Sequence, residues 1–97
     1  MKAVFIVFNQ ANTERVEYML DVLKINGFTM FEQVQGRGTN GGEPRRGTHA
    51  WPEMNSAILT VIPDDKVDEL LETVQKLDMR NPEIGVKAFS WAIESIV

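Results

Sequence analysis

The sequence contains no cysteine, and this absence excludes disulfide bonds, thiolate metal sites and cysteine nucleophiles. It contains one histidine, His49, so a single chain lacks the ligands of a closed zinc site. Its longest apolar run covers residues 3–8, far short of the roughly 18 residues that suggest a membrane-spanning helix. No basic leader with a cleavage site opens the chain. These absences predict a cytoplasmic protein that does not insert into a membrane.

The composition is that of an ordinary folded domain. Hydrophobic residues make up 43% and charged residues 25% of the 97 residues, and this length fits a single domain over residues 1–97. Ten basic and fourteen acidic residues give a formal net charge of -4. Because a negative field repels phosphate backbones, we expect no nucleic-acid partner.

Hydrophobic periodicity divides the chain into two β-α-β units. Short apolar runs rich in β-forming residues predict strands at residues 2–8, 28–34, 56–62 and 86–93. Two stripes with the spacing i, i+3, i+4, i+7 predict amphipathic helices between them. The stripe residues are Val16, Met19, Leu20 and Leu23 in the first helix and Val67, Leu70, Leu71 and Val74 in the second. Asn12 is the expected cap of the first helix, and Gly27 is the expected glycine after its end.

This βαββαβ order predicts an α+β domain with the ferredoxin-like fold. Right-handed crossovers place the strands in the order 4-1-3-2 in one antiparallel sheet, with both helices on one face. The strands at residues 2–8 and 56–62 are apolar on both faces, although two helices can cover only one. Because soluble monomers seldom expose large apolar patches, we expect the second face to pack on other subunits. The alternative is that the last residues or the long loop fold over it.

Residues 35–54 form a long segment without hydrophobic periodicity, and loops of this length are usually functional or disordered. The segment holds five of the seven glycines and two of the four prolines. Within residues 36–49, Arg37, Arg45 and Arg46 stand against Glu43, which gives a local charge of +2 in a chain of -4. This local reversal of sign predicts an acidic partner or an anionic ligand.

Residues 36–41 match the spacing G-x-G-x-x-G, but no amphipathic helix follows them, so a Rossmann-type dinucleotide site is excluded. Two interpretations stay open: the glycine amides form an anion-binding nest beside Arg37, or the segment is a flexible loop of turn residues. His49 is either a surface residue or, in a symmetric oligomer, one copy of a shared metal ligand. Trp51 is either an anchor for a partner or a plug that fixes the loop base.

No residue pattern supports catalysis. A nucleophile needs a positioned base, but Ser56 and Ser90 lie in strand patterns and His49 is the one good base. The neighbouring carboxylates Asp64 and Asp65 fall at the start of the second helix, where they complement its dipole. We therefore expect no enzymatic activity and no required cofactor.

Four short stretches, in this order and spacing, resemble the PII-like family of signal-transduction proteins. Residues 27–30 (GFTM) are similar to the family's Gly-Met-Thr-Val at the start of its second strand. Residues 34–38 (VQGRG) are similar to its Val-Lys-Gly-Phe-Gly, where the T-loop begins, and residues 87–89 (KAF) to the Lys-Ile-Phe of its last strand. Residues 46–52 (RGTHAWP) resemble a divergent PII-like branch that is associated with metal or drug efflux systems.

The resemblance implies a homotrimer whose inter-subunit clefts bind a small anionic ligand, with an adenine nucleotide as the candidate effector. It implies that Thr29 contacts the base of that nucleotide and that Lys87 meets a phosphate. Gly36 and Gly38 would let the backbone approach the ligand, with Arg37 beside them. The family's Gly-Asp-Gly before its lysine is replaced here by residues 84–86 (IGV), which predicts weak nucleotide affinity or a different ligand.

The resemblance further implies a regulatory role, such as nitrogen regulation, in which residues 35–54 act as the T-loop. This loop would dock on a regulated membrane transporter or enzyme. The side chains expected to face that partner are Arg45, Arg46, His49 and Trp51. Uridylylation of the usual kind is excluded, because the loop contains no tyrosine.

Two other functions stay open at this point. One is a metal-tolerance trimer of the same fold, similar to CutA, with His49 and Glu53 as metal ligands. The other is an interaction protein without a small ligand, linked to an efflux system, whose loop folds on its partner. Titration with nucleotides and with divalent metals separates these functions.

Overall fold

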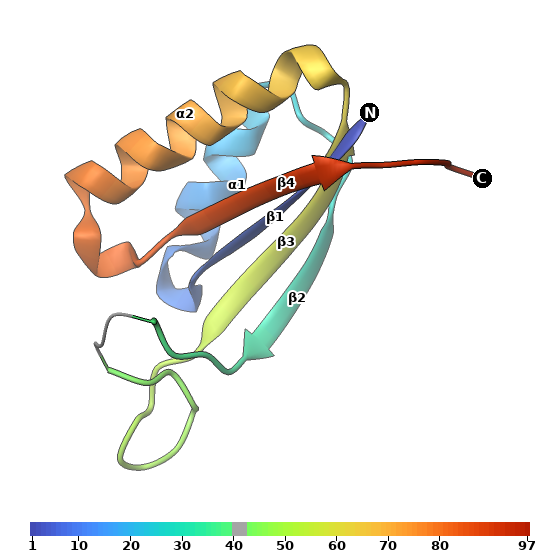
Figure 1. The fold of residues 1–97 in the computed structure, drawn as a ribbon. Coiled ribbons are helices and arrows are strands. Elements are labelled where there is room, and N and C mark those ends of the chain that lie inside the picture. Colours follow the sequence, from blue (N-terminus) through green and yellow to red (C-terminus); the bar gives the residue numbers. More distant parts are fainter. Residues whose placement is uncertain (40–42) are drawn as a thin grey trace.

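The computed structural model describes residues 1–39 and 43–97 of the chain. The elements are β1 (Lys2–Asn9), the 3-10 helix η1 (Gln10–Asn12), α1 (Thr13–Val22), β2 (Thr29–Val34), β3 (Asn55–Ile62), α2 (Asp64–Arg80), the 3-10 helix η2 (Pro82–Ile84) and β4 (Lys87–Ala92). This is the predicted βαββαβ order. Residues 35–54 connect β2 to β3, and we call them the 35–54 loop. The described residues of this loop extend below the sheet in Figure 1.

The four strands form one antiparallel sheet in the order β2-β3-β1-β4, which confirms the predicted order. The central strand β1 pairs with β3 along its whole length and with β4 as far as Val7, which lies opposite Lys87. The pairing of β2 with β3 shifts in register between Phe31 and Val34. Irregularities of this kind bend a strand, and this one lies directly before the 35–54 loop.

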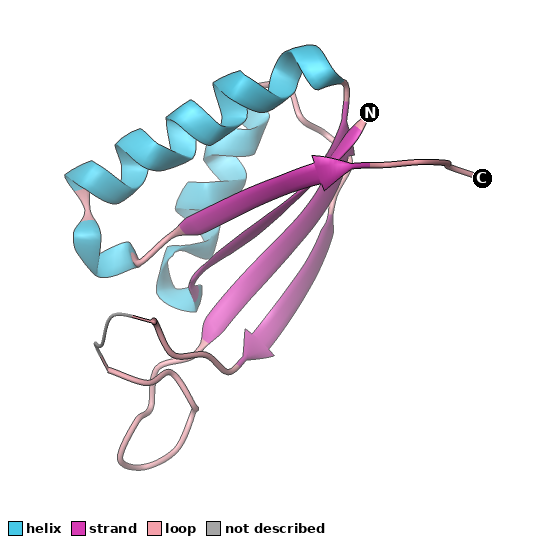
Figure 2. Ribbon diagram, viewed as in Figure 1, coloured by secondary structure: helices cyan, strands magenta, loops and turns pink. Residues whose placement is uncertain are grey.

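Both helices cover the same face of the sheet, as Figure 2 shows. On that face, alternate residues of β1, namely Val4, Ile6 and Phe8, are fully buried in the core. The helices contribute the stripe residues that the spacing predicted, of which Val16, Met19, Leu20, Val67, Leu70 and Val74 are buried. Each fully buried side chain of this size contributes about 1.5–3 kcal/mol to folding. In the described part of the chain, neither α-helix combines the length and apolar character needed to cross a bilayer.

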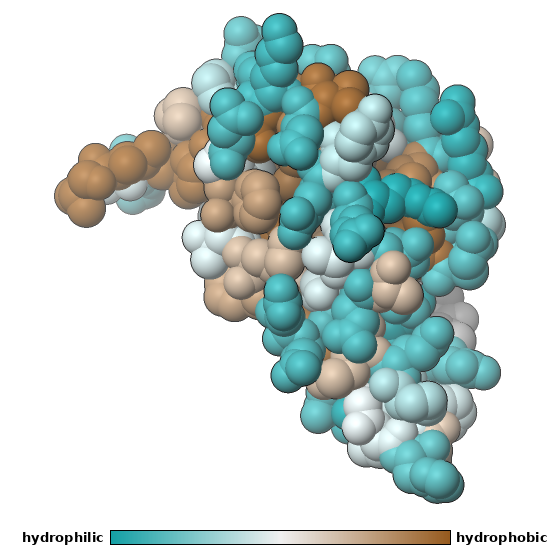
Figure 3. All heavy atoms as spheres, turned by 180° about the vertical axis from the view of Figure 1, so that it is seen from behind, coloured by the Kyte–Doolittle hydropathy of each residue, from teal (hydrophilic) through white to brown (hydrophobic). Residues whose placement is uncertain are grey.

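The opposite face of the sheet, which we call the open face, is also apolar but has no helix over it. It carries the intervening strand residues, among them Phe5, Val7, Phe31, Leu59, Phe89 and Trp91. The rings of Phe5 and Phe89 pack with their centroids 5.7 Å apart. Phe31, Phe89 and Trp91 are 43%, 53% and 47% exposed, so the described residues do not cover this face. The segment after β4 runs away from the sheet (Figure 1) and projects from the body when seen from behind (Figure 3).

One of the two local predictions at the ends of α1 is wrong. Asn12 stands at the predicted N-cap position, but its side chain makes no capping hydrogen bond. Asn9 makes the capping bond instead, one turn earlier, by accepting a backbone N–H of η1 at 3.0 Å. The helix ends several residues before Gly27, and Lys24 takes the left-handed conformation after it, with φ of 61°. The reversal that a glycine was expected to make is therefore made by Lys24.

Candidate ligand site at the base of the loop

Two backbone hydrogen bonds close the 35–54 loop at its base. The N–H of Gly36 donates to the carbonyl of Arg45 at 2.8 Å, and the N–H of Arg45 donates to the carbonyl of Gly36 at 2.7 Å. Together they form an isolated antiparallel bridge just beyond the end of β2. The bridge therefore holds Arg45 beside the body of the domain.

The side chain of Arg45 lies against the segment that leads into β4. Its Nη1 donates to Oδ1 of Asn55 at 2.9 Å and to the carbonyl of Ile84 at 3.5 Å. A Cβ atom at Gly85 would stand 2.8 Å from Nη2 of Arg45. Gly85 also has a φ of 60°, in the left-handed region that favours glycine. The backbone conformation therefore favours glycine at this position, and a side chain here would displace the guanidinium group of Arg45.

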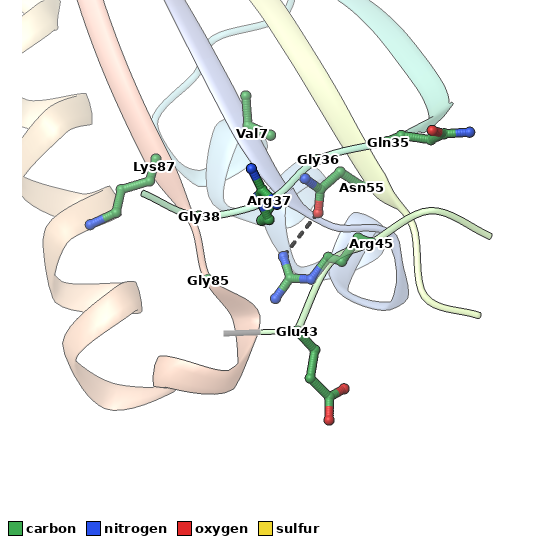
Figure 4. A pocket seen from close by; sticks show the side chains of 10 residues that line it. All are labelled: Val7, Gln35, Gly36, Arg37, Gly38, Glu43, Arg45, Asn55, Gly85 and Lys87. Carbon is green, nitrogen blue, oxygen red and sulfur yellow. Dashed lines mark hydrogen bonds between the residues drawn. The ribbon is translucent and has the colours of Figure 1, made fainter. Parts of the chain in front are cut away.

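These contacts form part of a pocket of about 380 Å³. Its lining residues are Val7, Gln35, Gly36, Arg37, Gly38, Glu43, Arg45, Asn55, Gly85 and Lys87. Three of them are cations, contributed by the loop and by β4, whereas Glu43 is the one carboxylate among them. Figure 4 shows the Glu43 side chain pointing away from Arg45. In a chain with a net charge of -4, this local positive excess favours an anionic ligand.

The structure brings together four of the five residues predicted to bind the ligand. Gly36, Arg37, Gly38 and Lys87 all line the pocket, although Lys87 is distant from the other three in the sequence. Thr29 does not line it. It is the first residue of β2, about 20 Å of extended chain away from the loop base at 3.3 Å per residue. One chain alone therefore does not place Thr29 and Lys87 in the same site.

The two glycines predicted at the loop base both line the pocket. The N–H of Gly36 is already used in the bridge, and a Cβ there would stand 2.7 Å from Nδ2 of Asn55, so Gly36 supplies space and not a donor. Neither Gly36 nor Gly38 has a positive φ. These two positions therefore do not form the type of anion-binding nest that uses a residue in the left-handed region. Asn40 and Gly41 of the same motif lie outside the described residues.

The four residues predicted to face a partner separate into two groups. Arg45 lines the pocket, whereas Arg46, His49 and Trp51 lie outside it on the far part of the loop. That part has its own turn, in which the N–H of Thr48 donates to the carbonyl of Trp51 at 2.9 Å. The N–H of Trp51 in turn donates to Oγ1 of Thr48 at 3.1 Å. Trp51 is 39% exposed at the end of this turn, which leaves its indole ring at the surface.

The described residues do not assemble a metal site around His49. Within residues 1–39 and 43–97, no group of three or more His, Asp or Glu side chains is arranged so that it could hold a metal ion. His49 is exposed in the turn, and Glu53 lies nearby, where its carbonyl accepts the N–H of Gly47 at 3.1 Å. One imidazole and one carboxylate are fewer ligands than a structural zinc site uses.

Five of the ten lining residues were not among the predicted site residues, and two of these five, Asn55 and Gly85, contact Arg45. Asn55 is the first residue of β3, and its side-chain amide accepts a hydrogen bond from Arg45, ten positions earlier in the sequence. Gly85 stands in the segment that replaces the family's Gly-Asp-Gly. A glycine shortly before a strand was the available signal, because such a residue often marks a left-handed backbone.

The structure combines a small α+β domain with a cationic pocket at the base of a long loop. The family described as nitrogen regulatory protein P-II matches residues 1–97, and the chain belongs to this family. Its members are signalling regulators and not enzymes, and they typically act as trimers on protein partners. The predicted resemblance is thereby confirmed. No curated protein matches the chain.

Solved structures with the same fold include CPII, a nitrogen regulatory PII-like protein from Thiomonas intermedia K12, bound to ADP, AMP and bicarbonate. It is 22% identical to this chain, with a TM-score of 0.77 over 95% of this chain and 84% of that one. The apo form of CPII gives 18% identity and a TM-score of 0.66 over 95% and 89%. A PII-like signalling protein from Thermus thermophilus gives 22% identity and a TM-score of 0.67 over 93% and 83%. At these identities, the likeness establishes the fold.

Proposed function

We propose that this protein is a homotrimeric regulator that binds an adenine nucleotide in clefts between subunits and signals through the 35–54 loop. The observation that carries this proposal is the pocket at the loop base, where Arg37, Arg45 and Lys87 surround about 380 Å³ of space. The pocket is lined partly by residues of the 35–54 loop, so a bound anion would contact the segment that is proposed to signal to the partner. We expect the protein to work in the cytoplasm, where its proposed ligand is found.

The open face supports the assembly. Leu59 at its centre and Phe89 and Trp91 beside it form an apolar surface that soluble monomers seldom leave uncovered. Packing this surface on two other copies buries it in a closed oligomer. Thr29 lies on the same face, opposite Leu59. It does not line the pocket of its own chain, so in the proposed trimer it contributes to the pocket of a neighbouring copy.

The ligand class is supported by charge and by the solved relatives. A phosphate group is a strong acceptor for arginine and lysine donors, and such charge-assisted bonds are about twice as strong as neutral ones. The relative from Thiomonas intermedia K12 is described as bound to ADP, AMP and bicarbonate, all of which are oxoanions. Because residues 84–86 depart from the family's Gly-Asp-Gly, we expect weaker nucleotide binding than that motif would give.

The far part of the loop supports the signalling role. Its turn at residues 48–51 presents Trp51 at the surface, and tryptophan is enriched among the residues that dominate binding energy in interfaces. Arg46 and His49 belong to the same part of the loop. A membrane transporter or an enzyme with an acidic docking surface is the partner that this arrangement suits.

The proposal is tested by measuring mass and ligand binding on the same preparation. Light scattering at micromolar concentration is expected to give three times the mass of the chain, and calorimetry is expected to detect binding of at least one of ATP, ADP, AMP and cyclic AMP. A stable monomer would contradict the assembly. A trimer that binds no nucleotide would transfer the function to the loop and its protein partner.

A further inference from the structure

The helix-covered side of the domain carries a second cavity, which is separate from the pocket at the loop base. It is a groove of about 460 Å³ between α1 and α2, and we call it the interhelix groove. On α1 its lining includes Arg15, Tyr18, Met19 and Val22. On α2 its lining is Thr73, Lys76, Leu77 and Arg80. Each helix therefore faces the groove with residues at the spacing i, i+3, i+4, i+7, which is one stripe along two helical turns.

The floor and one lip of the interhelix groove are apolar. Met19 is only 8% exposed, and the partly buried Leu23 and Leu77 pack against the core. Tyr18 and Val22 are 70% and 60% exposed, although they stand one turn apart on the same stripe of α1. Small-molecule sites bury most of their ligand, so side chains as exposed as these indicate a larger partner that covers the lip.

The charges of the two helices are sorted by sign around the groove. The helices carry nine carboxylates, three in α1 and six in α2, and none of these lines the groove. Three of their four basic residues do line it, namely Arg15, Lys76 and Arg80. Lys76 pairs with Glu72 at 3.4 Å, whereas neither arginine makes an ion pair within the described part of the chain. The groove is therefore a cationic strip on two otherwise acidic helices.

An acidic α-helix fits this strip better than an extended anionic surface does. A helix is about 10–12 Å wide, and two facing stripes form the kind of groove in which an amphipathic helix lies with its apolar side down. Its carboxylates would meet Arg15 and Arg80 without covering much of the surrounding surface. An anionic membrane extends further, so it would also meet the carboxylates of α1 and α2, which repel it.

We propose that the interhelix groove binds an amphipathic helix of a partner protein. An apolar stripe of that helix covers Tyr18 and Val22, and its acidic residues pair with Arg15 and Arg80. Tyrosine and arginine are both enriched among the residues that dominate interface energies. This docking surface goes beyond the proposed function, in which the partner contacts the 35–54 loop. Assembly through the open face uses the opposite side of the sheet from the helices (Figure 2), so it leaves the groove available on each copy.

The test uses synthetic peptides of about 18 residues, a length that allows a helix in isolation. All carry leucines at the spacing i, i+3, i+4, i+7, and their other positions hold alanine with glutamate, with lysine or with glutamine. Fluorescence anisotropy measures binding to the full-length protein, and amide NMR shifts locate the contact. The glutamate peptide is expected to bind about tenfold more tightly than the lysine peptide, with shifts in α1 and α2. Equal or tighter binding of either other peptide, shifts elsewhere, or no binding by the glutamate peptide would overturn the proposal.

Two matched pairs of variants test the residues. Tyr18→Ala is expected to weaken the glutamate peptide about tenfold, whereas Met79→Ala is expected to leave it unchanged, because Met79 is 73% exposed on α2 but does not line the groove. Arg80→Glu is expected to weaken the glutamate peptide and strengthen the lysine peptide. Lys24→Glu makes the same charge change outside the groove and is expected to do neither. Circular dichroism checks that each variant folds, and equal effects within either pair would overturn the proposal.

Dodecanoate and phosphatidylglycerol vesicles test the other occupants of the groove. Dodecanoate that binds at Tyr18 when no peptide does would assign the groove to a small amphipathic carboxylate. Vesicles that bind the wild type but not Tyr18→Ala would assign it to a membrane, and either result would overturn the proposal. The peptide measurements need no nucleotide, so a failure to bind ADP leaves them valid. A failure of the peptides to bind leaves the proposed function standing.

Discussion

The two faces of the sheet have almost the same apolar character and opposite surroundings. Ile58 and Leu59 are neighbours in β3, yet Ile58 is fully buried under the helices whereas Leu59 belongs to the open face. The covered face is completed by α1 and α2 of the same chain. The open face carries phenylalanine and tryptophan side chains that are about half exposed.

This difference shows that one alternating strand pattern specifies two kinds of packing. Residues on the covered face stabilise the fold of each chain, because their burial is complete without a partner. Residues on the open face contribute less to the stability of a single chain, because they stay partly exposed there. Their burial would stabilise an oligomer in which another copy covers them. A charged substitution on the covered face should therefore prevent folding, whereas one on the open face should prevent association.

The largest effect is expected from a charge placed on either face. Ile58→Asp puts a carboxylate without a partner into the helix-covered core, at a cost of several kcal/mol, and should prevent folding. Leu59→Asp puts the same charge on the open face and should leave a folded monomer. Circular dichroism and light scattering distinguish the two results. A folded trimer in Leu59→Asp would show that the open face is not the subunit interface.

The next largest effect concerns the cation that β4 contributes to the pocket. Lys87→Ala should weaken ADP binding roughly tenfold to a hundredfold, since a hydrogen bond to a charged group contributes about 1.5–3 kcal/mol. Lys76→Ala is the matched control, because Lys76 lies on the helix side, where it pairs with Glu72 at 3.4 Å. Calorimetry measures both, and equal affinities in the two variants would remove Lys87 from the site.

Much of this fold could be predicted from the sequence, because its signals are local. Residues 2–8 and 56–62 are continuous apolar runs, and the two helical stripes leave no other assignment for the segments that they cover. Short connections and right-handed crossovers then restrict the strand order to the one observed. The misplaced end of α1 has a similarly local cause, since Lys24 takes the conformation for which a glycine was expected.

The site was less predictable because its main contacts are not local. The role of Arg45 depends on Asn55, on the carbonyl of Ile84 and on the empty side-chain position at Gly85. Asn55 and the carbonyl of Ile84 have no sequence signature, since the first is already explained by its strand position and the second acts through the backbone. Gly85 has only the general signal of a glycine before a strand. The same holds for Gly36. The sequence indicates a backbone N–H that is free to bind an anion, whereas in the structure this N–H donates to the carbonyl of Arg45.

A smaller effect is expected from Gly85→Ala. Alanine at a φ of 60° costs about 1–2 kcal/mol, and its Cβ would stand against Nη2 of Arg45. The melting temperature should fall by several degrees, and Arg45 should leave the pocket. Gly27→Ala serves as the control, because a Cβ at Gly27 meets nothing within 4 Å and Gly27 has no positive φ. Equal melting temperatures in the two variants would contradict this account of Gly85.

The smallest expected effect concerns the exposed start of α2. The N-terminal ammonium group of Met1 lies 2.9 Å from Oδ1 of Asp64, and its hydrogen bond and charge lower the pKa of that carboxyl from the ordinary value of 3.8. The stabilisation is complete above that ordinary pKa and is lost as pH falls through the lowered pKa. Asp64→Asn should therefore reduce stability slightly at pH 7 and leave it unchanged at strongly acidic pH. A thermal melt at each pH measures this, and an equal loss at both would assign the effect to helix capping.

The Gly36–Arg45 bridge divides the 35–54 loop into two parts. Arg37, Gly38 and Glu43 lie between the two hydrogen-bonded residues and line the pocket, whereas Arg46, His49 and Trp51 follow the bridge and lie outside the pocket. Doubling the length of a flexible segment adds only about 0.6 kcal/mol of closure entropy. The segment between Arg45 and β3 can therefore change in length and sequence while the bridge and the pocket residues stay as they are, so one sensor can be adapted to a different partner without rebuilding its ligand site.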